Sequence, residues 1–360
     1  MARRIVVKVG TSSLTDERGR IYPPHLWAIA RGLQVLEDAW DARAVLVSSG
    51  AGAAGREQLG LNLPLTLPDK QAAAAVGQGL LMLDWARAFA PKPVAQLLLT
   101  ASDIQHRERY VNAKSALDAS LKHGAVPIIN ENDSVATHEI KLGDNDTLSA
   151  WAAYLIGADT LIILTDVNGL FDKDPRKFAD ARKLEQVKDI STVMHLAGNA
   201  GTQRGTGGMV TKLRAASIAA AAGIETRIMA GGGPGLETLA AGEAPGTRIL
   251  ASPGYSARKA WLAQQPSKGT IFVDAGAQRA LERGRSLLPK GVTGLSGNFQ
   301  FGDAVAVMQA DVKVAQGLSN YSSDALSRIQ GQHTQAISTL LGYKDYDEVI
   351  HRDNLVLMTS

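Results

Sequence analysis

The chain has 360 residues, enough for one large α/β domain or for a large domain followed by a small one. It contains no cysteine, which excludes disulfides, thiolate metal sites and cysteine nucleophiles, and its net charge of +3 gives little reason to expect nucleic-acid binding. No apolar run has the length of a signal-peptide core or a membrane span, so we expect a soluble, cytoplasmic protein.

Short β-rich runs alternate with helical patterns through the first two thirds of the chain. The expected strands cover residues 3–9, 44–48, 94–99, 125–129, 160–164 and 225–229. The expected helices cover residues 24–40, 71–88, 112–123, 146–156 and 210–222. This alternation is typical of crossover units on a buried, mainly parallel sheet flanked by helices. Ligands of such sheets collect at the carboxyl ends of the strands, so the loops there are candidates for a site.

The first expected strand contains a lysine, Lys8, and leads into Gly10 and the hydroxyl residues 11–13. A lysine in an apolar parallel strand is costly unless its ammonium meets an anion or reaches water. Glycine and hydroxyl residues beside it suit a phosphate cradle. The alternative is an edge lysine that simply extends into solvent.

Residues 48–55, Ser-Ser-Gly-Ala-Gly-Ala-Ala-Gly, follow the second expected strand and contain the spacing G-x-G-x-x-G. By itself this is a dinucleotide fingerprint, which keeps an NAD-dependent dehydrogenase among the alternatives. A complete strand and helix precede it, however, whereas the fingerprint belongs on the first strand of its unit. Small residues here also allow backbone N–H groups to approach a carboxylate or phosphate, and tight packing without a ligand is a third interpretation.

Two polar clusters, residues 130–133 and 143–147, lie between the strand at 125–129 and the next helix. Polar side chains at a carboxyl strand edge can bind the ammonium and carboxylate groups of an amino acid, and carboxylates can hold lysines in place. Capping of the helix by Asp144, Asn145 or Asp146 is a structural alternative that is compatible with binding. His138 has no partner histidine at metal-ligand spacing, so no metal site is expected there.

Two further segments suit a nucleotide. Thr165 and Asp166 close the strand at 160–164 and fit either a pocket edge or a plain turn. Residues 205–212 place glycines and Lys212 at the start of an Ala-rich helix, a strong anion-binding combination, although the P-loop spacing is absent. A purely structural Gly-rich loop is the alternative.

Proline and glycine residues punctuate the chain between about residues 245 and 269. We expect one domain over residues 1–250, a linker over 251–268 and a second domain over 269–350. The second domain shows short strands at 270–273, 304–308 and 312–315 and a helix near 275–283, which predicts a small β-rich unit.

Taken in order, five motifs resemble those of the amino acid kinase family. They are Lys8–Ser12, Val47–Ala51, Pro127–Asp133, Gly143–Asp146 and Gly205–Met209. Within the family the resemblance is greatest to members that phosphorylate glutamate, the first step of proline synthesis, although Ser48 stands where threonine is expected. Residues 286–291 and 297–299 resemble a PUA domain. The resemblance implies an amino acid kinase fold, with its mainly parallel sheet flanked by helices, and a small C-terminal β-rich, barrel-like PUA domain.

The resemblance also implies roles for particular residues, with ATP and Mg²⁺ as cofactors and no metal ligands from the protein. Lys8 and Lys212 would contact the transferring phosphoryl group, and Asp146 would orient the two lysines. Glutamate would be bound by Ser49, Asp133 and Asn145. ATP would be held by Lys8, Thr165, Asp166, Thr206, Gly207, Gly208, Met209, Val210, Thr211 and Lys212. A homo-oligomer, dimer or tetramer, and feedback inhibition by proline are further expectations of the resemblance.

The expected reaction is attack of the γ-carboxylate of glutamate on the γ-phosphate of ATP, giving γ-glutamyl phosphate. Phosphoryl transfer needs mainly positioning and positive charge, which two lysines and Mg²⁺ can supply. A carboxylate is ionised at neutral pH, so no general base is required.

Two alternatives of other kinds stay open. One is a kinase of the same family acting on aspartate, N-acetylglutamate, carbamate or a nucleoside monophosphate. The other is an RNA-binding protein, with Arg279, Arg283, Arg285 and Lys290 of the PUA module as a basic patch, although Glu282 dilutes it.

Overall fold

The computed structural model describes residues 2–100, 103–104, 107–135, 145–199, 208–230, 232–251, 262, 267–344 and 346–358. The chain divides into two compact units, Met1–Gly254 and Tyr255–Ser360. Each unit has its own hydrophobic core. Most of the expected linker over residues 251–268 lies outside the described residues.

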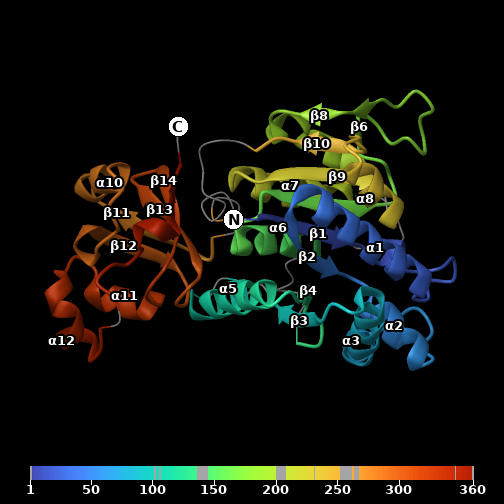
Figure 1. The fold of residues 1–360 in the computed structure, drawn as a ribbon. Coiled ribbons are helices and arrows are strands. Elements are labelled where there is room, and N and C mark those ends of the chain that lie inside the picture. The colour runs from blue at the N-terminus through green and yellow to red at the C-terminus, as the bar shows by residue number, and fades with distance from the viewer. Residues whose placement is uncertain are drawn as a thin grey trace. The chain divides into compact units, whose positions relative to one another are not determined.

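The described part of the first unit is built on an eight-stranded sheet with the order β3-β4-β2-β1-β5-β9-β10-β8 (Figure 1). Neighbouring strands run parallel except for β9 and β10, which are antiparallel. The strands are β1 (Arg3–Val9), β2 (Ala42–Ser48), β3 (Val94–Leu99), β4 (Val126–Glu131), β5 (Thr160–Thr165), β8 (Gln186–Val187), β9 (Glu225–Ala230) and β10 (Thr247–Ile249). A separate hairpin joins β6 (Leu170–Phe171) and β7 (Lys183–Leu184).

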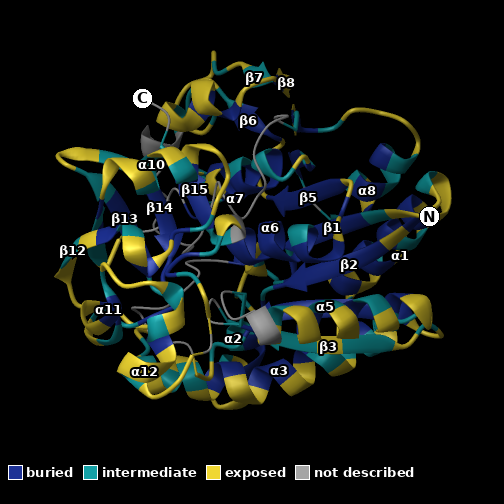
Figure 2. Cartoon of the chain, turned by 90° about the vertical axis from the view of Figure 1, so that its left-hand side faces the viewer, coloured by how far each residue is buried: buried dark blue, intermediate teal, exposed yellow. Residues whose placement is uncertain are grey.

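Helices cover both faces of this sheet (Figure 1). On one face lie α1 (Pro23–Trp40), α3 (Leu67–Phe89) and α8 (Gly232–Ala240), which share a core cluster with the sheet. On the other face lie α5 (Arg107–Lys122), α6 (Asn145–Ile156) and α7 (Met209–Ala221). A short helix, α2 (Ala51–Gln58), packs along α3. Figure 2 shows the central strands fully buried between these layers.

Strand β1 lies between β2 and β5 and is buried from Ile5 to Val9. Ile5, Val7 and Val9 join the core shared with α1, α3 and α8. Because successive side chains of a strand point to opposite faces, Lys8 is directed to the other face, where α6 lies. The alternative of an edge lysine is therefore wrong, since Lys8 occupies a central strand.

Two glycines of the residue 48–55 segment have structural roles. Gly50 connects β2 to α2 with a φ of 111°, which side chains other than glycine rarely adopt. Gly55 faces α3, and a Cβ placed there would lie 1.8 Å from the carbonyl oxygen of Ala73. Reciprocally, a Cβ on Gly77 of α3 would lie 1.8 Å from the carbonyl oxygen of Ala51. The two helices therefore pack with their backbones in contact.

The second unit contains, in its described residues, a five-stranded sheet with the order β12-β11-β13-β14-β15. Its strands are β11 (Gly269–Val273), β12 (Val292–Gly297), β13 (Ala304–Gln309), β14 (Val312–Leu318) and β15 (Leu355–Leu357), and its helices are α10 (Ala275–Glu282), α11 (Ser323–Ile329) and α12 (Ile337–Leu341). Phe299 and Ile271 are fully buried in its core. Among the helices of both units that the structure describes, none combines the length and the apolar character needed to cross a bilayer.

Candidate active site

A buried carboxylate holds two lysines at the centre of the first unit. Lys8 Nζ lies 2.7 Å from Asp146 Oδ1, and Lys212 Nζ lies 3.0 Å from Asp146 Oδ2. Asp146 is 0% exposed, and both lysines are also buried. Three separate elements meet here, because Lys8 comes from β1, Asp146 from the first turn of α6 and Lys212 from the first turn of α7. We call these three residues the lysine clamp.

Opposing influences act on the pKa of Asp146. Burial, the largest of them, raises the pKa, but the charges of Lys8 and Lys212 and hydrogen bonds from Lys8 and Thr211 together outweigh it. The pKa falls from 3.8 to about 2. At neutral pH the clamp therefore contains two positive charges and one negative charge, and its excess of positive charge suits an incoming phosphoryl group.

Thr211 ties the start of α7 to the clamp. Its hydroxyl lies 2.7 Å from Asp146 Oδ2 and 2.8 Å from the carbonyl oxygen of Gly208, the residue that caps α7. The first-turn N–H groups of a helix attract anions, and Lys212 stands one residue beyond Thr211. The end of the Gly-rich segment is thus fixed beside both lysines.

The residues expected to bind glutamate lie near the clamp from another direction. Asn145 precedes Asp146, and its Nδ2 donates to Ser49 Oγ at 2.9 Å and to Asn130 Oδ1 at 2.9 Å. Ser49 directly follows β2, and Asn130 lies near the end of β4. The carboxyl ends of adjacent strands thus bring together side chains that are 15 to 96 positions apart in the sequence.

Asp133, the third residue expected to bind glutamate, lines a hollow of about 770 Å³. Thr11 and Ser12, which follow Lys8 closely in the chain, also line it. Arg56 and Lys70 contribute positive charge to the same hollow. It therefore presents a carboxylate, hydroxyl groups and cations, the complement of an amino acid with both charges.

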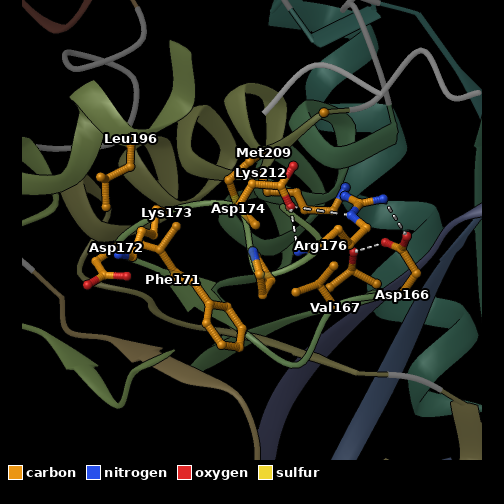
Figure 3. A pocket seen from close by; sticks show the side chains of 15 residues that line it. Asp166, Val167, Phe171, Asp172, Lys173, Asp174, Arg176, Leu196, Met209 and Lys212 are labelled. Atoms are coloured by element: carbon orange, nitrogen blue, oxygen red, sulfur yellow. Dashed lines mark hydrogen bonds and ion pairs between the residues drawn. The ribbon is translucent and has the colours of Figure 1, made fainter. Parts of the chain in front are cut away.

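A second pocket, of about 80 Å³, contains five of the residues expected to hold ATP: Thr165, Asp166, Gly208, Met209 and Lys212. Figure 3 shows Phe171 and Leu196 among the apolar side chains that line it. Arg176 lies beside Asp166, with 3.8 Å between its Nη1 and Asp166 Oδ2 (Figure 3). Lys212 of the clamp lines this pocket, whereas Thr11 and Ser12, which follow Lys8 in the sequence, line the hollow.

The other five residues expected to hold ATP do not line this pocket in the described structure. Lys8 and Thr211 contact Asp146 instead. Val210 is 49% exposed and is absent from the lining of this pocket, although its neighbour Met209 belongs to it. Thr206 and Gly207 lie outside the described residues, as do His138 and Asp144. Arg176, which lines the same pocket, was not among the residues expected from the sequence.

The described residues contain no group of three or more histidine, aspartate or glutamate side chains placed to hold a metal ion. In the second unit, four basic residues could form a surface for RNA: Arg279, Arg283, Arg285 and Lys290. All four are exposed, and Glu282, which lies among them in the sequence, is exposed as well.

Comparison with known proteins adds the following. The model of the amino acid kinase family matches residues 3–230, and the model of the PUA domain matches residues 269–341. The glutamate 5-kinase of Caldanaerobacter subterraneus subsp. tengcongensis is 48% identical over 364 residues, which cover 99% of this chain and 98% of that protein. The glutamate 5-kinase of Shewanella amazonensis is 48% identical over 366 residues, covering 99% and 96%.

A solved structure shares the fold of the first unit. Carbamate kinase from Giardia lamblia bound to AMP-PNP superposes with a TM-score of 0.50 and 20% identity, covering 70% of this chain and 99% of that one. At this identity the likeness concerns the fold alone.

Proposed function

The chain belongs to the amino acid kinase family, and on that premise we propose that it transfers the γ-phosphoryl group of ATP to the γ-carboxylate of L-glutamate. The product is γ-glutamyl phosphate, and the reaction is the first step of proline biosynthesis. The observation that carries the proposal is the lysine clamp, because it places two cations at the start of α7 and beside Asn145, one of the residues expected to bind glutamate.

ATP would lie against the pocket lined by Thr165, Asp166 and Lys212, which we call the nucleotide pocket, with its phosphates toward Lys212 and the start of α7. Mg²⁺ bound to the phosphates of ATP would supply further positive charge beside Lys8 and Lys212. Lys8 and Lys212 stabilise the charge on the phosphoryl group during transfer, and Asp146 keeps both ammonium groups in place. No side chain needs to remove a proton, because the attacking carboxylate is already ionised.

Asp133, which lines the hollow, offers a carboxylate to the substrate ammonium. Ser49 and Asn145, which are hydrogen-bonded to each other, offer a hydroxyl and an amide. The γ-carboxylate then points to the lysine clamp. This arrangement favours an amino acid over a nucleoside monophosphate, whose phosphate and base have no ammonium to pair with Asp133.

An assay of ATP consumption with hydroxylamine, which traps acyl phosphates as hydroxamates, tests the proposal. Glutamate should give a hydroxamate, and aspartate, N-acetylglutamate, carbamate and uridine monophosphate should give little turnover. Phosphorylation of aspartate without phosphorylation of glutamate would refute the proposed substrate.

The proposal extends to a cytoplasmic location, a homo-oligomer and inhibition by proline at or beside the glutamate site. These parts depend on the family relationship. Fractionation of cells, the mass of the protein in solution and the rate at millimolar proline test them in turn.

A further inference from the structure

A chain of buried amides connects helix α3 to the glutamate side of the site. Gln78 Oε1 accepts a hydrogen bond from Asn130 Nδ2 at 2.8 Å, and Asn130 Oδ1 accepts one from Asn145 Nδ2 at 2.9 Å. Asn145 Nδ2 in turn donates to Ser49 Oγ at 2.9 Å. Gln78, Asn130 and Asn145 are 7%, 2% and 8% exposed, so water competes little for these bonds.

The backbone N–H of Glu131 and the carbonyl oxygen of Gln78 hold the two ends of the Asn130 amide. The Glu131 N–H lies 2.9 Å from Asn130 Oδ1, and an N–H can only donate, so this end of the Asn130 amide must be its oxygen. The other end, Nδ2, then requires an acceptor, which Gln78 Oε1 supplies. With the Asn130 amide reversed, its NH₂ would face both the Glu131 N–H and Asn145 Nδ2, so the two hydrogen bonds to Asn130 Oδ1 would be lost, and its oxygen would face Gln78 Oε1.

The orientation passes along the chain to Asn145 and Ser49. Asn145 must direct Nδ2 to Asn130, and both protons of this nitrogen are then used, one on Asn130 and one on Ser49. Asn145 Oδ1 meets the N–H of Glu131 at 3.3 Å and has a second lone pair for another donor. Ser49 Oγ receives a proton from Asn145, so its own O–H proton can be donated onward.

The Asn145 carbonyl oxygen and the Ser49 hydroxyl match the two charged groups of an amino acid. A lone pair on Asn145 suits the ammonium group of a substrate, and the O–H proton of Ser49 suits a carboxylate. Had the amides faced the other way, Asn145 would offer N–H groups where the cation must bind. The orientation of the linked amides of Gln78, Asn130 and Asn145 therefore decides whether the site attracts or repels the charged groups of its substrate.

We propose that Gln78 is a positioning residue for glutamate: its carbonyl oxygen holds the Asn130 amide, and through it Asn145 and Ser49, in the orientation that accepts from the substrate ammonium and donates to its carboxylate. The inference rests on the proposed function. Gln78 acts from α3 without touching the substrate. The position of α3 is itself constrained, because Gly77 packs against the backbone of α2.

Two substitutions at this position separate orientation from mere packing. Gln78→Met keeps a side chain of similar length and removes the carbonyl acceptor. Gln78→Glu keeps an oxygen that can accept from Asn130 Nδ2. Gln58→Met, at an exposed position of α2, serves as the matched control. For each variant the kcat and the KM values for glutamate and for ATP are measured on the full chain, together with the urea midpoint of unfolding.

We expect Gln78→Met to raise the KM for glutamate by about tenfold or more, as the loss of an oriented buried hydrogen bond typically does. The KM for ATP should stay at the wild-type value, and Gln78→Glu should recover most of the lost affinity for glutamate. An unchanged KM for glutamate in Gln78→Met, or an equal rise of both KM values, would overturn the inference. Wild-type turnover of glutamate is measured in the same series, so its absence marks failure of the proposed function instead.

Discussion

At the scale of single residues, the lysine clamp has the physics of a buried ion pair with one cation in excess. Burying charges is expensive, and the cost is offset where the geometry is good and hydrogen bonds complete the set. Asp146 meets this condition through contacts of 2.7 to 3.0 Å with Lys8, Thr211 and Lys212. Removing either lysine takes away one of the two cations that stabilise the buried Asp146 carboxylate. Removing Asp146 leaves two buried lysines without the carboxylate that they share.

Replacing either lysine should sharply lower the rate of catalysis. Lys8→Ala and Lys212→Ala should each lower kcat by at least ~100-fold, because each loses a fixed charge contact to the phosphoryl group. Initial rates with saturating glutamate and ATP measure this effect. Lys188→Ala, at an exposed position, is the control and should keep the wild-type rate. Near-normal turnover in both lysine variants would contradict the mechanism.

The lowered pKa of Asp146 predicts how stability depends on pH. A carboxyl whose pKa drops from 3.8 to about 2 on folding stabilises the native state fully above its unfolded pKa, and the contribution is lost as the pH falls toward the folded pKa. The contribution is about 2 kcal/mol near pH 6 and roughly half of that near pH 3. The gap in stability between the wild type and Asp146→Asn should narrow accordingly. Urea unfolding at pH 6, 5, 4 and 3, followed by the fluorescence of the buried Trp85 and Trp151, measures it. A gap that stays constant would contradict the assigned pKa.

At the scale of elements, the contact between α2 and α3 is the tightest part of the substrate side. Gly77→Ala would bring a methyl group into the backbone of α2, and we expect a loss of stability of about 2 kcal/mol or more, as overpacking typically causes. Gly79→Ala is the matched control on the same helix, since a Cβ there meets nothing within 4 Å. That variant should be more stable by up to about 1 kcal/mol, because alanine is the better helix former. Urea midpoints of the two variants test the contrast, and equal midpoints would refute it.

The longer elements could be predicted from the sequence, and the reason is periodicity. The runs at residues 3–9 and 94–99 match β1 and β3, because apolar residues bounded by charge or proline leave few choices. The strands β6, β8 and β10 have two or three residues each, too few for any pattern. Helix α8 begins in a glycine run, where packing against α1 overrides low helix propensity, since a Cβ on Gly233 would lie 1.8 Å from the carbonyl oxygen of Ala28.

Some residues of the site could be predicted from the sequence, and others could not. Lys8, Ser49 and Asn130 lie on or directly after strands, so the rule that ligands gather at carboxyl strand ends was enough to bring them together. Gln78 is different, because it reaches Asn130 across 52 positions from the middle of a helix. Such a contact depends on how α3 packs on the sheet, which leaves no local signal. The roles of Thr206 and Gly207 stay predictions.

At the scale of the whole molecule, the site and the second unit are separate in the sequence. Every described residue of the clamp, the hollow and the nucleotide pocket belongs to the first unit, which has its own core. The second unit closes a different core around Ile271 and Phe299. We therefore expect the first unit to carry out phosphoryl transfer by itself.

A chain ending at residue 254 should keep the glutamate-dependent ATP consumption of the full chain to within about twofold, as expected where a domain has its own core. Circular dichroism checks that the shortened chain is folded, and the hydroxamate assay measures its activity. Loss of activity in a folded, shortened chain would contradict the assignment of the whole site to the first unit.

Gly77 and Gln78 are neighbours on α3, and their adjacency limits how this protein can diverge. The first fixes the distance between two helices, and the second fixes the direction of the amide chain. A change at Gly77 that moves α3 would also move Gln78 away from Asn130. The two positions therefore cannot change independently. Gly79 and Leu80 follow on the exposed side of the same helix and carry no such restriction. Inherited variation in α3 should therefore accumulate on its outer face, while its inner face changes only when packing and recognition change together.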